Sequence, residues 1–192
     1  TFSLVLEPQF LPVGEQFLLS EAVALALTDM FAHYGIATRI KWTNDIYAGN
    51  RKIVGMLIEH NCSGPTLARS IVGIGINVNQ AAFDPALPNP VSMAQLTGRT
   101  FDREEVLRTF LERFALRYEQ LRQGDQETLQ SDYRTRMYRL GERHAYRLPG
   151  QGETEGIIEG VRPTGELLVR HTDGTLGEYL FGEIEFVIGA KR

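Results

Sequence analysis

The spacing of apolar residues predicts that the chain opens with a strand and a long core helix. Residues 2–6 show the alternation of a sheet strand. Between residues 15 and 34, apolar side chains recur at helical spacing, and Gly35 follows where a C-terminal cap is expected. We therefore expect a strand at residues 2–6 and a core helix at residues 15–34.

Three segments rich in Ile and Val come next and predict neighbouring strands. They span residues 38–42, 52–60 and 67–79, with turn residues between them. We expect these three segments to be adjacent strands.

Helical patterns return after a proline-containing loop. Ser92–Leu96 fits one helical turn, and Asp102 with Glu105 resembles a capping box that opens a longer helix. That helix should stop at Gly124, and a shorter helix containing Tyr133 should follow it.

From Gly141 the pattern changes to short alternating strands between glycines. Strands are expected at residues 156–161, 166–170 and 175–180, with turns between them. This pattern predicts a small antiparallel barrel after the main domain. The expected domains are residues 1–140 and 141–192.

Composition and charge narrow the functional classes. The 192 residues carry a formal net charge of -4, which disfavours a protein that binds nucleic acid by neutralising phosphates. The single cysteine, Cys62, cannot form an internal disulfide, and no apolar run is long enough to span a bilayer. We expect a cytoplasmic protein without a membrane segment or signal peptide.

Lysine is rare in this chain. Only Lys41, Lys52 and Lys191 are present among the 20 basic residues, and two of them lie close together in sequence. Such lysines provide compact point charges for phosphates or carboxylates, although their grouping is equally compatible with chance.

Several common sites are excluded by spacing. The four histidines are isolated from one another and from cysteine, which argues against a zinc site or any other metal site built from a side-chain cluster. Gly73–Val78 begins like a dinucleotide fingerprint, but Val78 stands where a glycine is required. A Rossmann site is therefore rejected.

A tight turn predicts a cluster of charged side chains. If Gly49–Asn50 forms a two-residue hairpin, Tyr47 pairs with Lys52, and Asp45 projects from the same face. A carboxylate and an ammonium group then share one surface with room for a ligand.

The last Ile- and Val-rich segment is asymmetric. Alternation places Gly73, Gly75, Asn77 and Asn79 on the face opposite its β-branched side chains. Glycines within a strand often mark the close approach of a ligand or of another backbone. A flat ligand-binding floor and a crossing backbone are equally compatible with this pattern.

Three segments in this order resemble the bacterial biotin protein ligases. They are Lys41–Asp45 (KWTND), Arg51–Met56 (RKIVGM) and Gly73–Asn79 (GIGINVN). The resemblance covers essentially the whole chain, including the glycine-rich C-terminal part.

The resemblance implies a fold and an activity. The implied fold is of the α+β class, a mixed sheet with helices that is related to class II aminoacyl-tRNA synthetases, followed by a small SH3-like β-barrel. The activity is the joining of biotin to ATP, which gives biotinyl-5'-AMP, and the transfer of biotin to a lysine of a biotin carboxyl carrier domain. Biotin, ATP and Mg²⁺ are the implied ligands, with Mg²⁺ held through ATP phosphates near Asp45.

The resemblance also implies the site residues. Lys52 and Asp45 match catalytic positions, with Lys52 contacting the biotin carboxylate and the α-phosphate. The residues expected to bind biotin or ATP are Lys41, Trp42, Asn44, Lys52, Gly55, Gly73, Gly75 and Asn77.

The sequence departs from the family in three respects. Thr43 replaces the usual proline, and the glycine- and arginine-rich loop that precedes the Phe2 strand in the family is not in this sequence, so we expect a catalytic domain without its N-terminal part. Strict alternation would also place Gly55 on the face opposite Lys52, so a bulge is required between them.

Two other functions remain open. One is a lipoate or octanoate ligase of the same fold, although the two strand glycines and the KWTND segment favour biotin. The other is a non-catalytic module that binds a ligand or nucleic acid. A homodimer is also possible.

Overall fold

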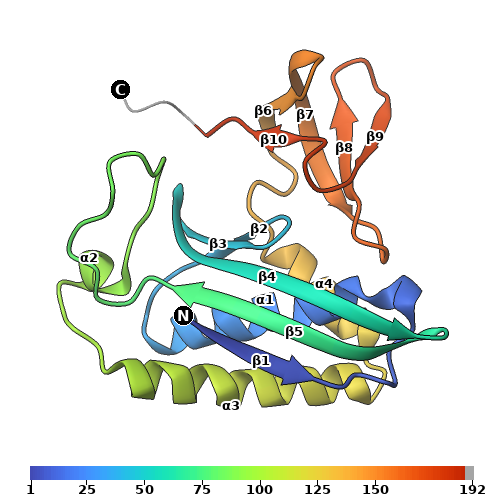
Figure 1. Ribbon diagram of the computed structural model, residues 1–192. Helices are drawn as coiled ribbons and strands as arrows, with labels where there is room; N and C mark the ends of the chain where they lie inside the picture. The colour runs from blue at the N-terminus through green and yellow to red at the C-terminus, as the bar shows by residue number, and fades with distance from the viewer. Residues whose placement is uncertain (189–192) are drawn as a thin grey trace.

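The computed structural model describes residues 1–188, which form two β-sheets and a layer of helices (Figure 1). The predicted α+β class is confirmed. The helices cover one face of the first sheet, and the second sheet stands at the end of the first where β2 and β3 lie.

The first sheet has the order β1-β5-β4-β3-β2. Its strands are β1 (Phe2–Leu6), β2 (Arg39–Lys41), β3 (Asp45–Ala48), β4 (Arg51–Ser63) and β5 (Thr66–Ile76). All four ladders are antiparallel, so the expectation of a mixed sheet is wrong. Tight turns set the direction of three of these ladders, β2 with β3, β3 with β4 and β4 with β5, because such turns join neighbouring strands only in the antiparallel sense. No turn sets the direction of the fourth, since β1 ends at Leu6 and β5 begins at Thr66. Parallel pairing is limited to isolated bridges.

A β-bulge lies where β3 meets β4. Tyr47 pairs with Lys52, but Asp45 pairs with Gly55, so β4 carries one extra residue between these two pairs. This is the bulge that the sequence required. It turns Lys52 and Gly55 to the same face of the sheet, beside Asp45.

The helices bury the other face of this sheet. They are η1 (Val13–Glu15), α1 (Phe17–His33), α2 (Met93–Thr97), α3 (Arg103–Arg122) and α4 (Gln126–Thr135). Helix α1 is buried nearly all round because the sheet lies on one side and α3 and α4 on the other. Asp29 of α1 forms ion pairs with Arg117 of α3 and with Arg136, which follows α4.

The second sheet has the order β10-β6-β7-β8-β9 and is also antiparallel. Its strands are β6 (Arg143–Leu148), β7 (Gly152–Val161), β8 (Leu167–His171), β9 (Leu176–Tyr179) and β10 (Glu185–Phe186). Within residues 1–188, β9 and β10 do not pair with each other, so the closed SH3-like barrel stays a prediction. The boundary at residues 140 and 141 is likewise still our expectation, and residues 189–192 of that unit lie outside the described part.

Trp42 connects the two sheets. Its side chain is 4% exposed, and its indole Nε1 donates a hydrogen bond of 2.9 Å to the carbonyl oxygen of Gly165. Within residues 1–188, no helix combines the length and the apolar character that a membrane span needs.

Candidate functional site

Asp45 and Lys52 form the centre of the candidate site. Asp45 Oδ1 lies 2.6 Å from Lys52 Nζ, and the two residues come from adjacent strands joined by the Gly49–Asn50 turn. The carboxylate side chain is 12% exposed, whereas the Lys52 side chain is 43% exposed. The more exposed lysine can therefore leave the carboxylate for an anionic ligand at lower cost.

Lys41 brings a second ammonium group to the same carboxylate. Its Nζ lies 3.6 Å from Asp45 Oδ2, and its side chain is 17% exposed. Burial lowers the pKa of Lys41; Asp45 opposes this shift, and the positive charge of Lys52 adds to it. Two ammonium groups facing one carboxylate leave a net positive charge of about one, which favours a phosphate or carboxylate ligand.

The glycines of β5 leave an open floor beside this cluster. A Cβ atom added at Gly73 would come no closer than 3.6 Å to any atom of the described residues, and one added at Gly75 no closer than 3.8 Å. Protein packing therefore does not require glycine at either position, because the backbone oxygens that the added atoms would meet, those of Leu57 and Gly55, belong to the adjacent strand β4 and lie at ordinary contact distance. Of the two interpretations left open by the sequence, this geometry favours the ligand floor.

A cavity of about 400 Å³ lies over this floor. The predicted residues that line it are Asp45, Lys52, Gly55, Gly75 and Asn77. A Cβ at Gly55 would lie 3.1 Å from both Cε and Nζ of Lys52, so glycine at this position leaves room for the lysine side chain. Gly73 lies on the same strand but does not line the cavity.

The loop between β5 and α2 forms the opposite wall, which sequence reasoning missed. The wall residues are Phe83, Leu87, Pro88, Asn89 and Pro90. The prolines predicted a loop, but the only signal for a binding wall was the presence of two large apolar residues, Phe83 and Leu87, in that loop. This loop adds to the edge of β4 through two backbone hydrogen bonds, from Lys52 N to Asn89 O at 2.8 Å and from Val91 N to Lys52 O at 2.9 Å.

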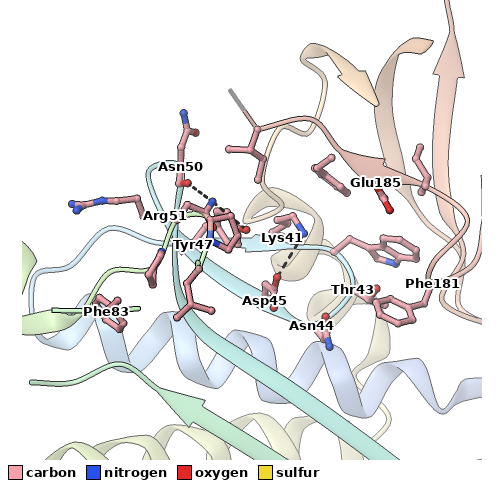
Figure 2. A pocket seen from close by; sticks show the side chains of 18 of the residues that line it. Lys41, Thr43, Asn44, Asp45, Tyr47, Asn50, Arg51, Phe83, Phe181 and Glu185 are labelled. Carbon is pink, nitrogen blue, oxygen red and sulfur yellow. Dashed lines mark hydrogen bonds and ion pairs between the residues drawn. The ribbon is translucent and has the colours of Figure 1, made fainter. Parts of the chain in front are cut away.

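A larger cavity of about 850 Å³ extends from Asp45 towards the second sheet (Figure 2). Lys41, Trp42, Asn44 and Asp45 line one side of it, and Phe181, Ile184, Glu185 and Phe186 line the side formed by the second sheet. These C-terminal residues were also missed, because nothing in a local pattern shows that the second sheet reaches the site.

Two of the predicted ligand-binding groups are already engaged within the protein. Asn44 Nδ2 donates to Met56 O at 2.7 Å, so this amide holds β4 while its Oδ1 stays available. Asn77 Nδ2 donates to Lys52 O at 3.4 Å. The peptide bond between Trp42 and Thr43 is cis.

The described residues contain no group of three or more His, Cys, Asp or Glu side chains that could hold a metal ion. Asp45 is the one predicted site residue with a carboxylate. A cation at this site would therefore depend mainly on oxygen atoms of the ligand, as Mg²⁺ does when it binds with phosphates.

The sequence and the fold are similar to those of known proteins. Residues 1–77 match the model of the Biotin/lipoate A/B protein ligase family. The chain is 36% identical over 163 residues to a biotin–acetyl-CoA-carboxylase ligase of Paracoccus denitrificans, a match that covers 81% of this chain and 68% of that protein. The chain belongs to the biotin protein ligase family.

Other relatives extend the comparison. A bifunctional ligase/repressor BirA of Bacillus subtilis is 37% identical over 122 residues, and the match spans 60% of this chain but only 37% of the relative. The structure of the Aquifex aeolicus biotin protein ligase in complex with biotin and ATP superposes with a TM-score of 0.79 at 27% identity, covering 98% of this chain and 78% of that one.

Proposed function

We propose that this protein activates biotin with ATP to give biotinyl-5'-AMP and transfers the biotinyl group to a lysine of a biotin carboxyl carrier domain. The observation that carries this proposal is the convergence of Lys52, Asp45 and the open Gly75 floor in one cavity of a biotin protein ligase fold. We further infer a cytoplasmic enzyme with a catalytic unit at residues 1–140 and a C-terminal unit at 141–192.

Lys52 is the residue best placed for adenylation. Its ammonium group is half-exposed, faces the cavity and is held there by Asp45 until a ligand arrives. In the proposed reaction, the biotin carboxylate attacks the α-phosphate of ATP, and pyrophosphate leaves. Lys52 would stabilise the negative charge at these oxygens, where a preformed positive charge is most effective in a partly enclosed site.

Asp45 would keep the two lysines in place and would later face the amine of the acceptor lysine. Gly55 and Gly75 would let biotin approach the sheet, and Asn77 would contact the adenylate from the end of β5. Mg²⁺ would bind through ATP phosphates with Asp45 as the nearby carboxylate. Catalysis would rest on positioning and charge, with no covalent enzyme intermediate.

The test is calorimetric titration of biotin with Mg²⁺, with and without ATP, followed by mass spectrometry for biotinyl-5'-AMP. In the full chain, Lys52→Ala should weaken biotin binding on the order of tenfold or more and should suppress adenylate formation. Arg69→Ala, which removes an exposed cation elsewhere on β5, is the control. If the protein turned over lipoate or octanoate and not biotin, it would be a lipoate or octanoate ligase. If none of the three compounds bound, the proposal would be overturned.

A further inference from the structure

Lys41 and Lys52 share one carboxylate but lie in different surroundings. Lys52 is 43% exposed at the edge of the cavity, whereas Lys41 is 17% exposed and faces the second sheet. Figure 2 shows Lys41 pointing to Asp45, with Glu185 of the second sheet on the far side of the cavity. The difference in exposure suggests that the two lysines have different tasks.

Two aromatic rings surround the Lys41 ammonium group. Its Nζ lies 4.8 Å from the ring centre of Phe186 and 5.5 Å from that of Tyr47. A ring face attracts a cation and replaces part of the hydration that burial removes. Tyr47 comes from the first sheet, but Phe186 comes from β10 of the second.

The ring of Phe186 is itself held in place. Its strand pairs with β6, where Phe186 lies opposite Tyr146, and the two rings meet edge to face at 5.4 Å. Tyr138 also stacks on this ring, with the two ring centres 6.3 Å apart. Arg139 Nη1 donates to the carbonyl oxygen of the next residue, Val187, at 3.1 Å. The second sheet therefore fixes where this ring lies against Lys41.

We propose that Phe186 is a positioning residue that keeps Lys41 on Asp45, so that Lys52 is free to leave the carboxylate for the anionic substrate. If both ammonium groups left, the mostly buried Asp45 carboxylate would have no positive charge beside it, and an unpaired buried charge is unfavourable in free energy. If Lys41 stays, Asp45 remains neutralised and in place while Lys52 binds phosphate or carboxylate oxygens. This inference rests on the proposed function and makes the second sheet part of the adenylation site.

The kinetic test compares Phe186→Leu with Phe186→Tyr. The leucine variant removes the ring face, and at saturating biotin and ATP its rate of adenylate formation should fall about tenfold. The KM for biotin should change far less than kcat, because Lys52 and the glycine floor are intact. The tyrosine variant keeps the ring and should stay within about twofold of the parent.

Control variants separate this effect from loss of the fold. Tyr179→Leu removes an aromatic ring from β9 of the same sheet, away from Lys41, and should leave the rate unchanged. If Phe186→Leu does not fold, as judged by thermal unfolding, Phe186→Met fills the space without a ring and takes its place. A leucine or methionine variant that keeps the full rate would overturn the proposal.

A second measurement is independent of activity. The chain has three lysines, so selective ¹³C and ¹⁵N labelling of lysine gives three side-chain signals, which Lys41→Arg and Lys191→Arg assign. The Hε signals of Lys41 should lie upfield of those of the unfolded chain because of ring currents. They should move back towards that position in Phe186→Leu but not in Phe186→Tyr.

The two measurements distinguish the possible failures. Lys41 signals that do not respond to Phe186→Leu would overturn the contact and with it the proposal. A response of the signals without a change in rate would disprove the positioning role and leave the proposed function standing. A parent protein that forms no adenylate, but whose Lys41 signals respond, would disprove the proposed function and the role assigned to Phe186 while retaining the contact.

Discussion

At the scale of single residues, the site depends on the position of one ammonium group, that of Lys52. The Asp45 carboxylate lies 2.6 Å from this group, and Gly55 leaves room for the end of the lysine side chain. The Asn89 carbonyl oxygen acts at a distance, because it accepts from the backbone N–H of Lys52. Because a charged hydrogen bond is sensitive to small displacements, crowding at any of these points should reduce ligand affinity before it reduces stability.

Gly55→Ala tests this sensitivity. The new Cβ would lie 3.1 Å from Lys52 Cε and Nζ, so the flexible end of the lysine must move away from its present place. We expect biotin affinity in calorimetry to fall about tenfold, with a change in unfolding free energy below about 1 kcal/mol. Gly14→Ala, where a Cβ meets nothing within 4 Å, is the control. Unchanged affinity in Gly55→Ala would show that Lys52 does not act from its observed position.

The sequence could predict part of this cluster but not all of it. The Gly49–Asn50 turn sets the pairing of Tyr47 with Lys52, and that local rule was sufficient. The bulge that brings Gly55 to the same face followed only from the family resemblance, because alternation alone places it on the other face. The contact of Lys41 with Phe186 was not predictable, since it depends on how the second sheet docks.

At the scale of elements, the loop between β5 and α2 is attached directly to the strand that carries Lys52. Besides its backbone bonds to Lys52, the loop is held by Asn89, whose Nδ2 donates to Asn50 O at 2.8 Å and to Tyr47 Oη at 3.4 Å. The wall of the cavity is therefore hydrogen-bonded directly to the strand that carries the proposed catalytic lysine.

Asn89→Ala should loosen this wall. We expect the apparent KM for ATP to rise by about five- to tenfold with a smaller change in kcat, because fewer loop conformations then close the cavity. Steady-state kinetics of adenylate formation measure this, and faster hydrogen exchange at the Lys52 and Val91 amides should accompany it. Tyr47→Phe, which removes only the longer of the two side-chain bonds, should have a smaller effect; a KM unchanged in Asn89→Ala would contradict the coupling.

The junction between the two sheets depends on Trp42. Trp42→Phe removes its hydrogen bond to Gly165 and leaves a buried carbonyl oxygen without that partner. The expected loss of unfolding free energy is about 1 to 3 kcal/mol, measured by urea denaturation. Phe10→Leu, at a ring that is 40% exposed, should cost less. A cost for Trp42→Phe no larger than for this control would show that the junction does not stabilise the fold.

At the scale of the whole molecule, the sequence predicted most of the elements, although not β6 and β10, and it did not predict how the second sheet docks. The long helix, the strands and the hairpins follow from periodicity and turns, and β5 keeps Val72 and Ile74 buried opposite its glycines. The expectation of a mixed sheet came from the family resemblance, although the short turns already required antiparallel pairing of β2 with β3, β3 with β4 and β4 with β5. Closure of the second sheet cannot be derived from strand patterns, because closure depends on pairing between its edge strands.

The packing of the helices also makes the stability of the fold depend on pH. Glu21 of α1 is 3% exposed, its Oε2 has no hydrogen-bond partner within residues 1–188, and burial raises its pKa to about 8. In the folded state the Glu21 carboxyl group therefore stays protonated up to about pH 8, whereas in the unfolded chain it loses its proton above its ordinary pKa of 4.5. Between these values the unfolded chain binds fewer protons, so the free energy of unfolding falls as pH rises towards about 8.

Glu21→Gln removes this titrating group, so the free energy of unfolding should fall less steeply as pH rises. Urea denaturation at pH 5 and pH 9 should show that the free energy of unfolding of the variant, relative to that of the parent, is higher at pH 9 by a few kcal/mol. The size of this difference follows from the raised pKa of Glu21. Glu112→Gln, on the exposed face of α3, should leave the parent's pH dependence unchanged. A Glu21→Gln protein that loses stability with pH as steeply as the parent would mean that this carboxyl ionises freely in the fold, and that the α1 core admits water at this point.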